Sequence, residues 1–117
     1  MEAADQIVTD GPFAGVSKWT LNVKEDPGDP NFLQRDFGSD VTAPALPTVG
    51  LQNSVLNLTT YDATPWHGFT NTFWGQCETA LDNLVHRYIG GTMDTLTSPN
   101  DPVFFLHHAN VDRLYAL

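Results

Sequence analysis

The sequence predicts a mainly α-helical fold with long irregular loops, and three observations support this prediction. Two segments in the C-terminal part repeat apolar residues at helical spacing, and both contain histidine. The first fifty residues are rich in turn formers and show little periodicity. At 117 residues, the chain can form at most one small domain. We therefore expect an irregular segment followed by helices.

Residues 1–64 make up the predicted irregular segment. Asp, Gly and Pro cluster at several points along it and favour turns. Between these turns, Trp19, Leu21 and Val23 alternate with polar residues, as in a half-buried strand. So long a stretch without periodicity is unusual in an independent small domain. We therefore expect this segment to wrap around a larger body.

Residues 51–60 are expected to form a short helix, because apolar residues recur there at helical spacing. Thr64 and Pro65 then favour the start of the helical part of the chain, residues 65–117. Threonine is a good N-cap, and proline suits the first helical position.

The first helix that carries histidine is predicted over residues 78–89, where apolar side chains follow a helical repeat. Gly90 and Gly91 supply the stop signal. Asp82 and His86 are four residues apart, so they stack on one face with about 5–6 Å between Cβ atoms.

The second helix with histidine is predicted over residues 101–117. Asp101 is a suitable N-cap and Pro102 suits the first helical position. His107 and His108 are neighbours, so their side chains leave the helix about 100° apart. The helical repeat is still running at the last residue, and we expect the chain to be a fragment of a longer protein.

The histidines of these two helices indicate a metal site. Neutral imidazole is the commonest protein ligand for transition metals. Two antiparallel helices joined by a short loop can aim His86 and the pair His107-His108 at one point. From the residues alone, a hydrogen-bonded core histidine at position 86 remains an alternative.

Composition and charge exclude several classes of function. Five basic residues against fourteen acidic ones give a net charge of −9, which argues against a nucleic-acid partner. No stretch approaches the about 20 apolar residues of a membrane span, and the first residues lack a signal-peptide pattern. The one cysteine, Cys77, cannot form an internal disulfide and is expected to be buried. We expect a soluble, acidic, globular chain, whose compartment the sequence does not indicate.

Residues 98–113 read SPNDPVFFLHHANVDR. This run resembles the second copper-binding signature of the tyrosinase family, which includes catechol oxidases and molluscan-type haemocyanins. Residues 81–93 resemble the preceding helix of bacterial-type tyrosinases. Short motifs are similar to the segment between the two copper-binding halves, at residues 10–13, 32–35, 46–48 and 61–62. The resemblance covers nearly the whole chain, and residues 98–113 carry its most specific part.

The resemblance implies that residues 1–117 are a partial copper-binding domain, half of a tyrosinase-like four-helix copper bundle. Family members hold two coppers, each by three histidines, and oxidise phenols with dioxygen. By this resemblance His86 and His108 correspond to ligands of the second copper, and copper is the expected cofactor. In the family, the first-copper ligands precede the segment that resembles residues 10–13. We therefore expect the second half alone.

Two positions depart from the family pattern. Asp82 stands where the remaining second-copper histidine is expected. A carboxylate is a harder ligand than imidazole and favours divalent copper. Asp82 can either bind the metal or accept a hydrogen bond from His86. Trp74 stands at the position that resembles the glutamate holding a water near the coppers in many tyrosinases.

Further residues are expected around the metal without binding it. His107 is expected to bond a backbone carbonyl or a carboxylate, and Asn83 resembles the residue that orients a histidine or water in the family. Phe104 is expected in the core or above the second copper, and Asp112 in a structural pair with the arginine that follows it. His67 is expected in a loop, with replacement of the missing ligand as an alternative.

The parent reaction that the resemblance implies is oxidation of mono- or diphenols to o-quinones with dioxygen. Because one half-site cannot hold two coppers, we expect the chain alone to be inactive. A partner chain or a second copy would complete the bundle and the site. Two alternatives remain open: a degenerate, non-catalytic metal-binding module and an oxygen-carrier-like protein.

Overall fold

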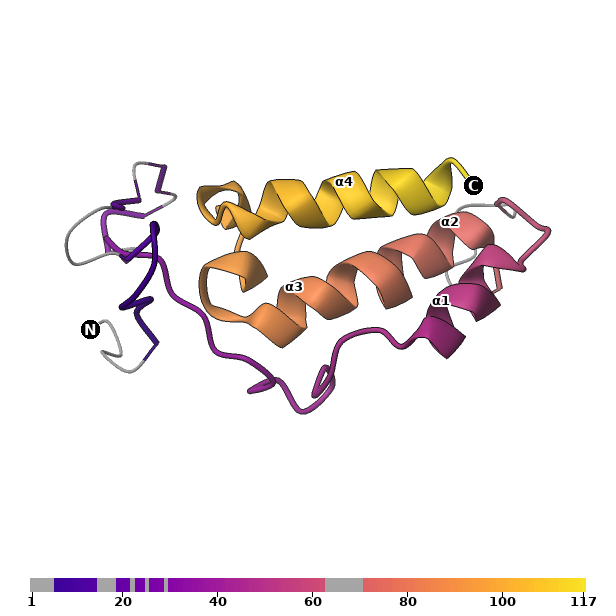
Figure 1. Cartoon of the computed structure of the whole chain (residues 1–117), viewed down its shortest axis with the longest axis horizontal. Helices are drawn as coiled ribbons and strands as arrows, with labels where there is room; N and C mark the ends of the chain where they lie inside the picture. The colour runs from indigo at the N-terminus through magenta and orange to yellow at the C-terminus, as the bar shows by residue number, and fades with distance from the viewer. Residues whose placement is uncertain (1–5, 15–18, 22, 25, 29, 63–70) are drawn as a thin grey trace.

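The computed structural model describes residues 6–14, 19–21, 23–24, 26–28, 30–62 and 71–117. As predicted, the fold is mainly α-helical, and the described residues form isolated bridges but no strand. Helices α2, η1 and α3 follow one another without a break, and α4 runs antiparallel beside them (Figure 1). The bounds are α1 Val49–Leu56, α2 Phe73–Gln76, η1 Cys77–Asp82, α3 Asn83–Ile89, η2 Gly91–Asp94, η3 Ser98–Asn100 and α4 Val103–Tyr115.

The continuous helical rod from α2 to α3 contains one irregularity. Its middle section, η1, is a π-helix, whereas η2 and η3 are short 3-10 helices in the loop to α4. π-Helical turns are rare and are frequently found at functional sites. Asp82 is the last residue of η1 and His86 lies in α3, so the change in helix type lies between these two predicted ligands.

A small apolar core joins α1, η1 and α4. Val55, Cys77, Leu81 and Leu114 are buried in it. The expected burial of Cys77 is confirmed. This core fixes the distance between the rod and α4 at the end of the molecule where α1 lies (Figure 1). None of the described helices has both the length and the apolar character that a bilayer crossing requires.

The N-terminal segment lies against the other end of the rod, near the turn after α3 (Figure 1). The Asp36 N–H donates to the Ile89 carbonyl at 2.8 Å, and the Thr92 N–H donates to the Gln34 carbonyl at 2.9 Å. Gly91 has a φ of +53°, and a Cβ there would lie 2.4 Å from the Gln34 oxygen. Glycine is therefore required at position 91 by both backbone conformation and close approach.

Several boundaries of the helices in the structure differ from the predicted ones. The predicted helix 51–60 is α1, which begins earlier because the Thr48 side chain caps it and ends at Leu56. The predicted strand at Trp19 is wrong, because Thr20 forms one isolated bridge with Phe32 and no ladder extends it among the described residues of this segment. The second histidine helix ends at Tyr115. Thr64, Pro65 and His67 lie outside the described residues.

Candidate metal centre

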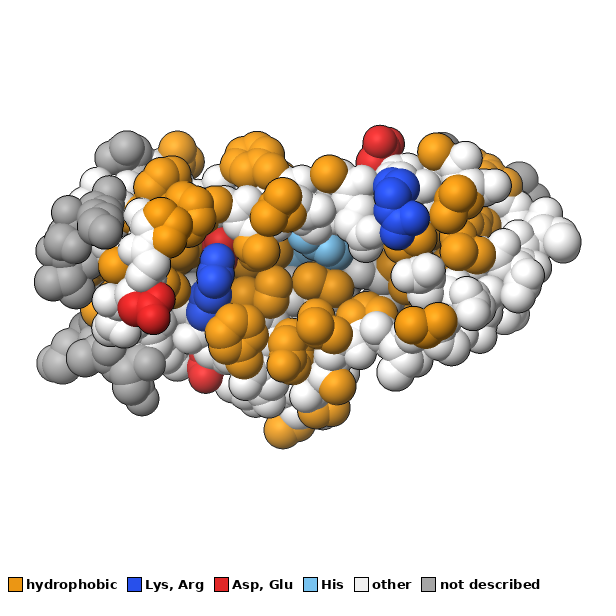
Figure 2. Space-filling model, viewed as in Figure 1, with side chains coloured by type: hydrophobic (Ala, Val, Ile, Leu, Met, Phe, Trp, Pro, Cys, Tyr) orange, Lys and Arg blue, Asp and Glu red, His pale blue; other side chains and the backbone are white. Residues whose placement is uncertain are grey.

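Four side chains converge between the rod and α4. Asp82 comes from the end of η1, His86 from α3, and His107 and His108 from α4. We call these four residues the histidine–aspartate cluster. The ring centroids of the three histidines are 5.2–5.3 Å apart. In Figure 2, histidine atoms lie in a recess at the middle of the molecule, bordered by hydrophobic side chains.

The His86 ring is held in a defined orientation. Its Nδ1 lies 2.7 Å from the Met93 carbonyl oxygen. A carbonyl can only accept, so Nδ1 carries the proton and the Nε2 lone pair is directed into the cluster. A hydrogen bond from the remote ring nitrogen is how metal-binding histidines are usually oriented. Nε2 of His86 lies 3.2 Å from Nε2 of His108.

The Asp82 carboxylate contacts all three histidines. Its Oδ1 lies 2.8 Å from Nε2 of His107, 3.6 Å from Nε2 of His86 and 3.8 Å from Nδ1 of His108. Burial raises the pKa of Asp82, but the hydrogen bond from His107 and the charges of the three histidines lower it, and the pKa lies below its ordinary value. The cluster therefore contains an ionised carboxylate at neutral pH.

His108 is the more accessible of the two neighbouring histidines. Its side chain is 41% exposed, whereas that of His107 is 7% exposed. Burial lowers the pKa of His108, and His107 and His86 lower it further, although Asp82 opposes them. Neutral imidazole, the form that binds metals, is thus favoured at His108.

These donor atoms fit one transition-metal ion. Donor atoms of Asp82, His86 and His107 all lie within 4.8 Å of one another. An ion about 2 Å from each imidazole nitrogen places two such nitrogens about 3 Å apart, which is close to the separation between His86 and His108. Within the described part of the chain, no other set of three such residues meets this criterion.

The other predicted neighbours have different surroundings. Phe104 packs against His108 with ring centroids 4.1 Å apart. The Asn83 amide donates to Glu78 at 3.3 Å. Asp112 is exposed on α4, and the predicted pair with Arg113 is not formed, because Arg113 donates to Asn110 instead.

Two contacts near the cluster were not predicted. One is the Met93 carbonyl, which the turn at Gly90 and Gly91 brings back to His86. The other is a bidentate pair between Arg35 and the fully buried Asp101, with N–O distances of 2.8 and 2.9 Å. Asp101 also accepts from the Val103 N–H at the start of α4, although the N-cap position is Pro102, one residue later than predicted. Every residue has a backbone carbonyl, so the sequence does not indicate which one contacts His86. Arg35 is 66 residues from Asp101, and sequence patterns do not predict a pair at that separation.

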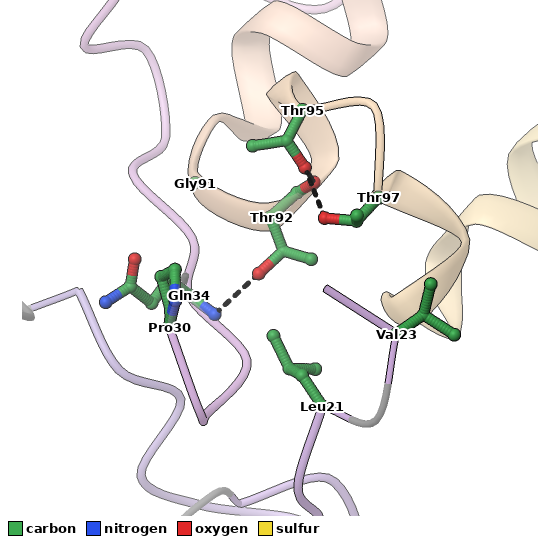
Figure 3. A pocket seen from close by; sticks show the side chains of 8 residues that line it. All are labelled: Leu21, Val23, Pro30, Gln34, Gly91, Thr92, Thr95 and Thr97. Atoms are coloured by element: carbon green, nitrogen blue, oxygen red, sulfur yellow. Dashed lines mark hydrogen bonds between the residues drawn. The ribbon is translucent and has the colours of Figure 1, made fainter. Parts of the chain in front are cut away.

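An open hollow lies beside the cluster. It has a volume of about 480 Å³ and is bordered by His86, Asn83, Met93 and Leu96, among others. A more enclosed cavity of about 170 Å³ lies between the N-terminal segment and the turn after α3 (Figure 3). Its wall contains Leu21, Val23, Pro30, Thr92, Thr95 and Thr97. This enclosed cavity has no ionisable side chain in its lining. Members of the cluster border other pockets: His86 borders the open hollow, and His107 borders a further pocket of about 200 Å³.

Two antiparallel helical segments that direct imidazoles at one point define a helical metal-binding domain. In a comparison with protein-family sequence models, residues 2–117 match the model for the common central domain of tyrosinase. The chain therefore belongs to the tyrosinase family, whose members bind copper.

The chain is similar to bacterial members of this family. Tyrosinases of Streptomyces antibioticus and Streptomyces glaucescens are each 45% identical to it over 117 aligned residues, which cover 96% of this chain and 41% of each relative. Grixazone synthase of Streptomyces griseus is 35% identical over 144 aligned residues, covering 97% of this chain and 46% of the relative. The chain thus spans less than half the length of these relatives. The resemblance to bacterial-type tyrosinases is confirmed.

Proposed function

We propose that this chain provides the second-copper half of a tyrosinase-like oxidase. In this proposal His86 and His108 bind one copper ion, and Asp82 occupies the place of the third imidazole. The observation that carries the proposal is the Nε2–Nε2 distance of 3.2 Å between two histidines on separate helices. Family membership supports copper as the metal.

The parent reaction in this proposal is oxidation of mono- or diphenols to o-quinones with dioxygen. Copper, when bound, supplies the electron transfer. The residues of this chain would orient His86 through Met93, keep Asp82 ionised, and border a hollow that can admit a planar phenol. Phe104, which packs on the His108 ring, would limit how that ring can turn.

We further propose that the chain alone does not turn over phenols. A two-copper site takes six imidazoles in this family, and the sequence contains four histidines. A partner chain or a second copy would have to supply the remaining ligands. The exposed apolar side chains of Phe105 and Leu106 on α4, next to the histidine pair, suit such a contact.

Copper analysis and an activity assay test the proposal together. We expect at most one Cu(II) per chain after copper loading, and loss of that copper in His108→Ala. Catechol oxidation by the loaded chain should equal that of free copper at the same concentration. Two tightly bound coppers per chain, or rapid quinone formation, would contradict the proposal.

A second candidate function is a degenerate metal-binding module without catalysis. Asp82 in place of an imidazole and Trp74 in place of the water-holding glutamate favour it. The two candidates differ when the chain is mixed with a first-copper half from a bacterial tyrosinase. Recovery of catechol oxidation supports the oxidase half, and its absence despite formation of the complex supports the module. An oxygen-carrier-like protein would instead bind dioxygen reversibly in that complex.

A further inference from the structure

The side chain of His107 lies among the candidate metal-binding groups, although His107 does not correspond to a copper ligand in the family pattern. Its side chain is 7% exposed, and its Nε2 lies 2.8 Å from Oδ1 of Asp82. A carboxylate can only accept, so this nitrogen carries a proton in the metal-free chain. A metal ion can take the place of that proton between nitrogen and oxygen, with the imidazole then protonated on Nδ1. The contact of His107 with Asp82 is thus compatible with metal binding.

The three imidazole rings have the mutual spacing of a set around one ion. Their centroids are 5.2 Å apart for His86 and His107, 5.2 Å for His107 and His108, and 5.3 Å for His86 and His108. Imidazoles bound through nitrogens about 2 Å from one ion have ring centres about 5 Å apart. Neighbouring residues leave a helix about 100° apart, so the side chains of His107 and His108 must both turn toward α3 to reach this arrangement.

The carboxylate links these rings into one donor set. Oδ1 of Asp82 lies between 2.8 and 3.8 Å from a nitrogen of each histidine. The grouping of donor atoms within 4.8 Å contains Asp82, His86 and His107. A set of imidazoles with one carboxylate suits a divalent ion such as Cu(II), Zn(II) or Co(II) better than Cu(I).

We propose that His107 is a metal ligand in this chain and supplies the imidazole that position 82 lacks. One divalent ion is then held by Asp82, His86 and His107, with His108 as a further ligand. This inference rests on the proposed function for the presence of a metal at the cluster. It adds a ligand that differs from the family pattern. The competing interpretation gives His107 a single role, as hydrogen-bond donor to Asp82.

Counting the imidazoles on bound Cu(II) separates the two interpretations. The probe is Cu(II) alone, added to the full chain at less than one equivalent, and pulsed electron paramagnetic resonance reports how many imidazoles it binds. The decisive variant is His67→Gln, because it leaves His86, His107 and His108 as the histidines of the chain. We expect three imidazoles in this variant and in the unmodified chain.

His107→Gln and His108→Gln form a matched pair of variants. Glutamine at 107 retains an N–H that can donate to Asp82 but is a poor ligand for Cu(II). In His107→Gln we expect Cu(II) to be bound by two imidazoles and with a lower affinity than in the unmodified chain. The Cu(II) affinity follows from competition with a chelator of known affinity.

Each outcome decides the question. An unchanged count in His107→Gln overturns the assignment of His107. If His107→Gln does not fold, the count in His108→Gln decides: two imidazoles support His107 as a ligand, and one overturns it. Loss of copper in His108→Gln with no change in His107→Gln overturns this inference but leaves the proposed function intact. No specific Cu(II) binding by the unmodified chain overturns both.

Discussion

At the scale of single residues, the Asp82 carboxylate has more than one effect on the cluster. It is a negative charge among three imidazoles, and it is also a hard oxygen donor. An ionised carboxylate stabilises a divalent ion more than a monovalent one, and imidazole serves both oxidation states of copper. We therefore expect the residue at position 82 to set the preference of a bound copper ion between Cu(II) and Cu(I).

Asp82→His tests this role. We expect the variant to bind Cu(I) about tenfold more tightly, equivalent to about 1.4 kcal/mol, because a neutral soft donor replaces a charged hard one. Cu(I) affinity is measured by competition with a Cu(I)-specific chelator. Asp112→His, on the exposed face of α4, is the matched control and should leave Cu(I) binding unchanged. We expect no catechol oxidation by either variant alone, and an unaltered Cu(I) affinity in Asp82→His would contradict the argument.

A second prediction at this scale concerns Asp40. Hydrogen bonds from the Thr42 hydroxyl and Thr42 N–H, followed by that of Arg87, lower the pKa of Asp40 from 3.8 to about 2. Because the folded pKa lies below the unfolded one, these contacts stabilise the fold above about pH 4. That stabilisation is lost as the pH falls toward 2.

Asp40→Asn should therefore lower the melting temperature at pH 7 and have a shrinking effect as the pH falls from 4 to 2. Arg87→Met removes one of the three contacts, so it should raise the Asp40 pKa part of the way. Thermal unfolding across this pH range, with a direct NMR titration of Asp40, provides the measurement. A constant difference in melting temperature at all pH values would show that Asp40 acts through something other than its charge.

The metal site was partly predictable at the residue scale. The four-residue spacing of Asp82 and His86 predicts that they share a helix face, and they do lie close together. The hydrogen bonds from His107 to Asp82 and from His86 to Met93 are tertiary contacts that depend on how α4 and the loop before it pack. A carbonyl or carboxylate partner was expected for His107, but spacing along the sequence carries no information about such packing, so neither Asp82 nor Met93 was identified beforehand.

At the scale of elements, the turn after α3 joins two parts of the chain. Its backbone accepts and donates hydrogen bonds with the N-terminal segment on one side, and the Met93 carbonyl orients His86 on the other. We therefore expect any change in the turn to affect both the irregular segment and the orientation of the His86 ring. Glycine at position 91 permits the close approach to the Gln34 backbone.

Gly91→Ala should destabilise the chain strongly. The new Cβ would lie 2.4 Å from a backbone oxygen at a φ of +53°, so we expect a loss of about 2–4 kcal/mol in the free energy of unfolding. Gly50→Ala in α1 is the control, because its Cβ would meet nothing closer than 3.7 Å and alanine favours helix; we expect it to be neutral or slightly stabilising. Urea unfolding measures both. Equal stabilities of the two variants would show that the turn relaxes at no cost.

The predicted elements agree with the structure where apolar residues recur at helical spacing within one segment of the chain. The helices around His86 and His107 follow from apolar spacing with clear start and stop signals, and they are α3 and α4 with their flanking turns. The π-helix η1 has no such signal, because its apolar residues fit an α-helical repeat almost as well. The strand expected at Trp19 failed because a strand needs a neighbour, and the facing segment pairs with it at one bridge.

At the scale of the whole molecule, the chain is more extended than its length requires. Its radius of gyration is 16.1 Å, with extents of 47 × 28 × 27 Å. A compact domain of this length has a radius of about 13 Å. Large apolar side chains remain exposed on α4, with Phe105 62% and Leu106 72% accessible. Both observations favour a body that is completed by another polypeptide.

We expect the isolated chain to associate with itself or to unfold at a low temperature. Light scattering should then report a mass above the 12.9 kDa of one chain, and Phe105→Ser with Leu106→Ser should reduce it toward that value. Replacing the exposed Val41, which lies outside α4, with serine is the control and should leave the mass unchanged. A monodisperse monomer with a sharp transition at high temperature would contradict the interpretation as a half.

The bidentate pair between Arg35 and Asp101 joins two segments that are far apart in the sequence, and this separation affects the order in which parts of the chain fold. The two residues are 66 positions apart, and the contact of Gln34 with Thr92 spans 58. Closing such long loops costs conformational entropy before the long-range contacts can form. Formation of these contacts is therefore expected to be slow. During synthesis, Arg35 is made before Asp101. Until residues 92–101 have been made, the segment around Arg35 lacks the residues that it contacts in the folded chain. The segment around Arg35 can therefore reach its final place only after the residues up to Asp101 have been made.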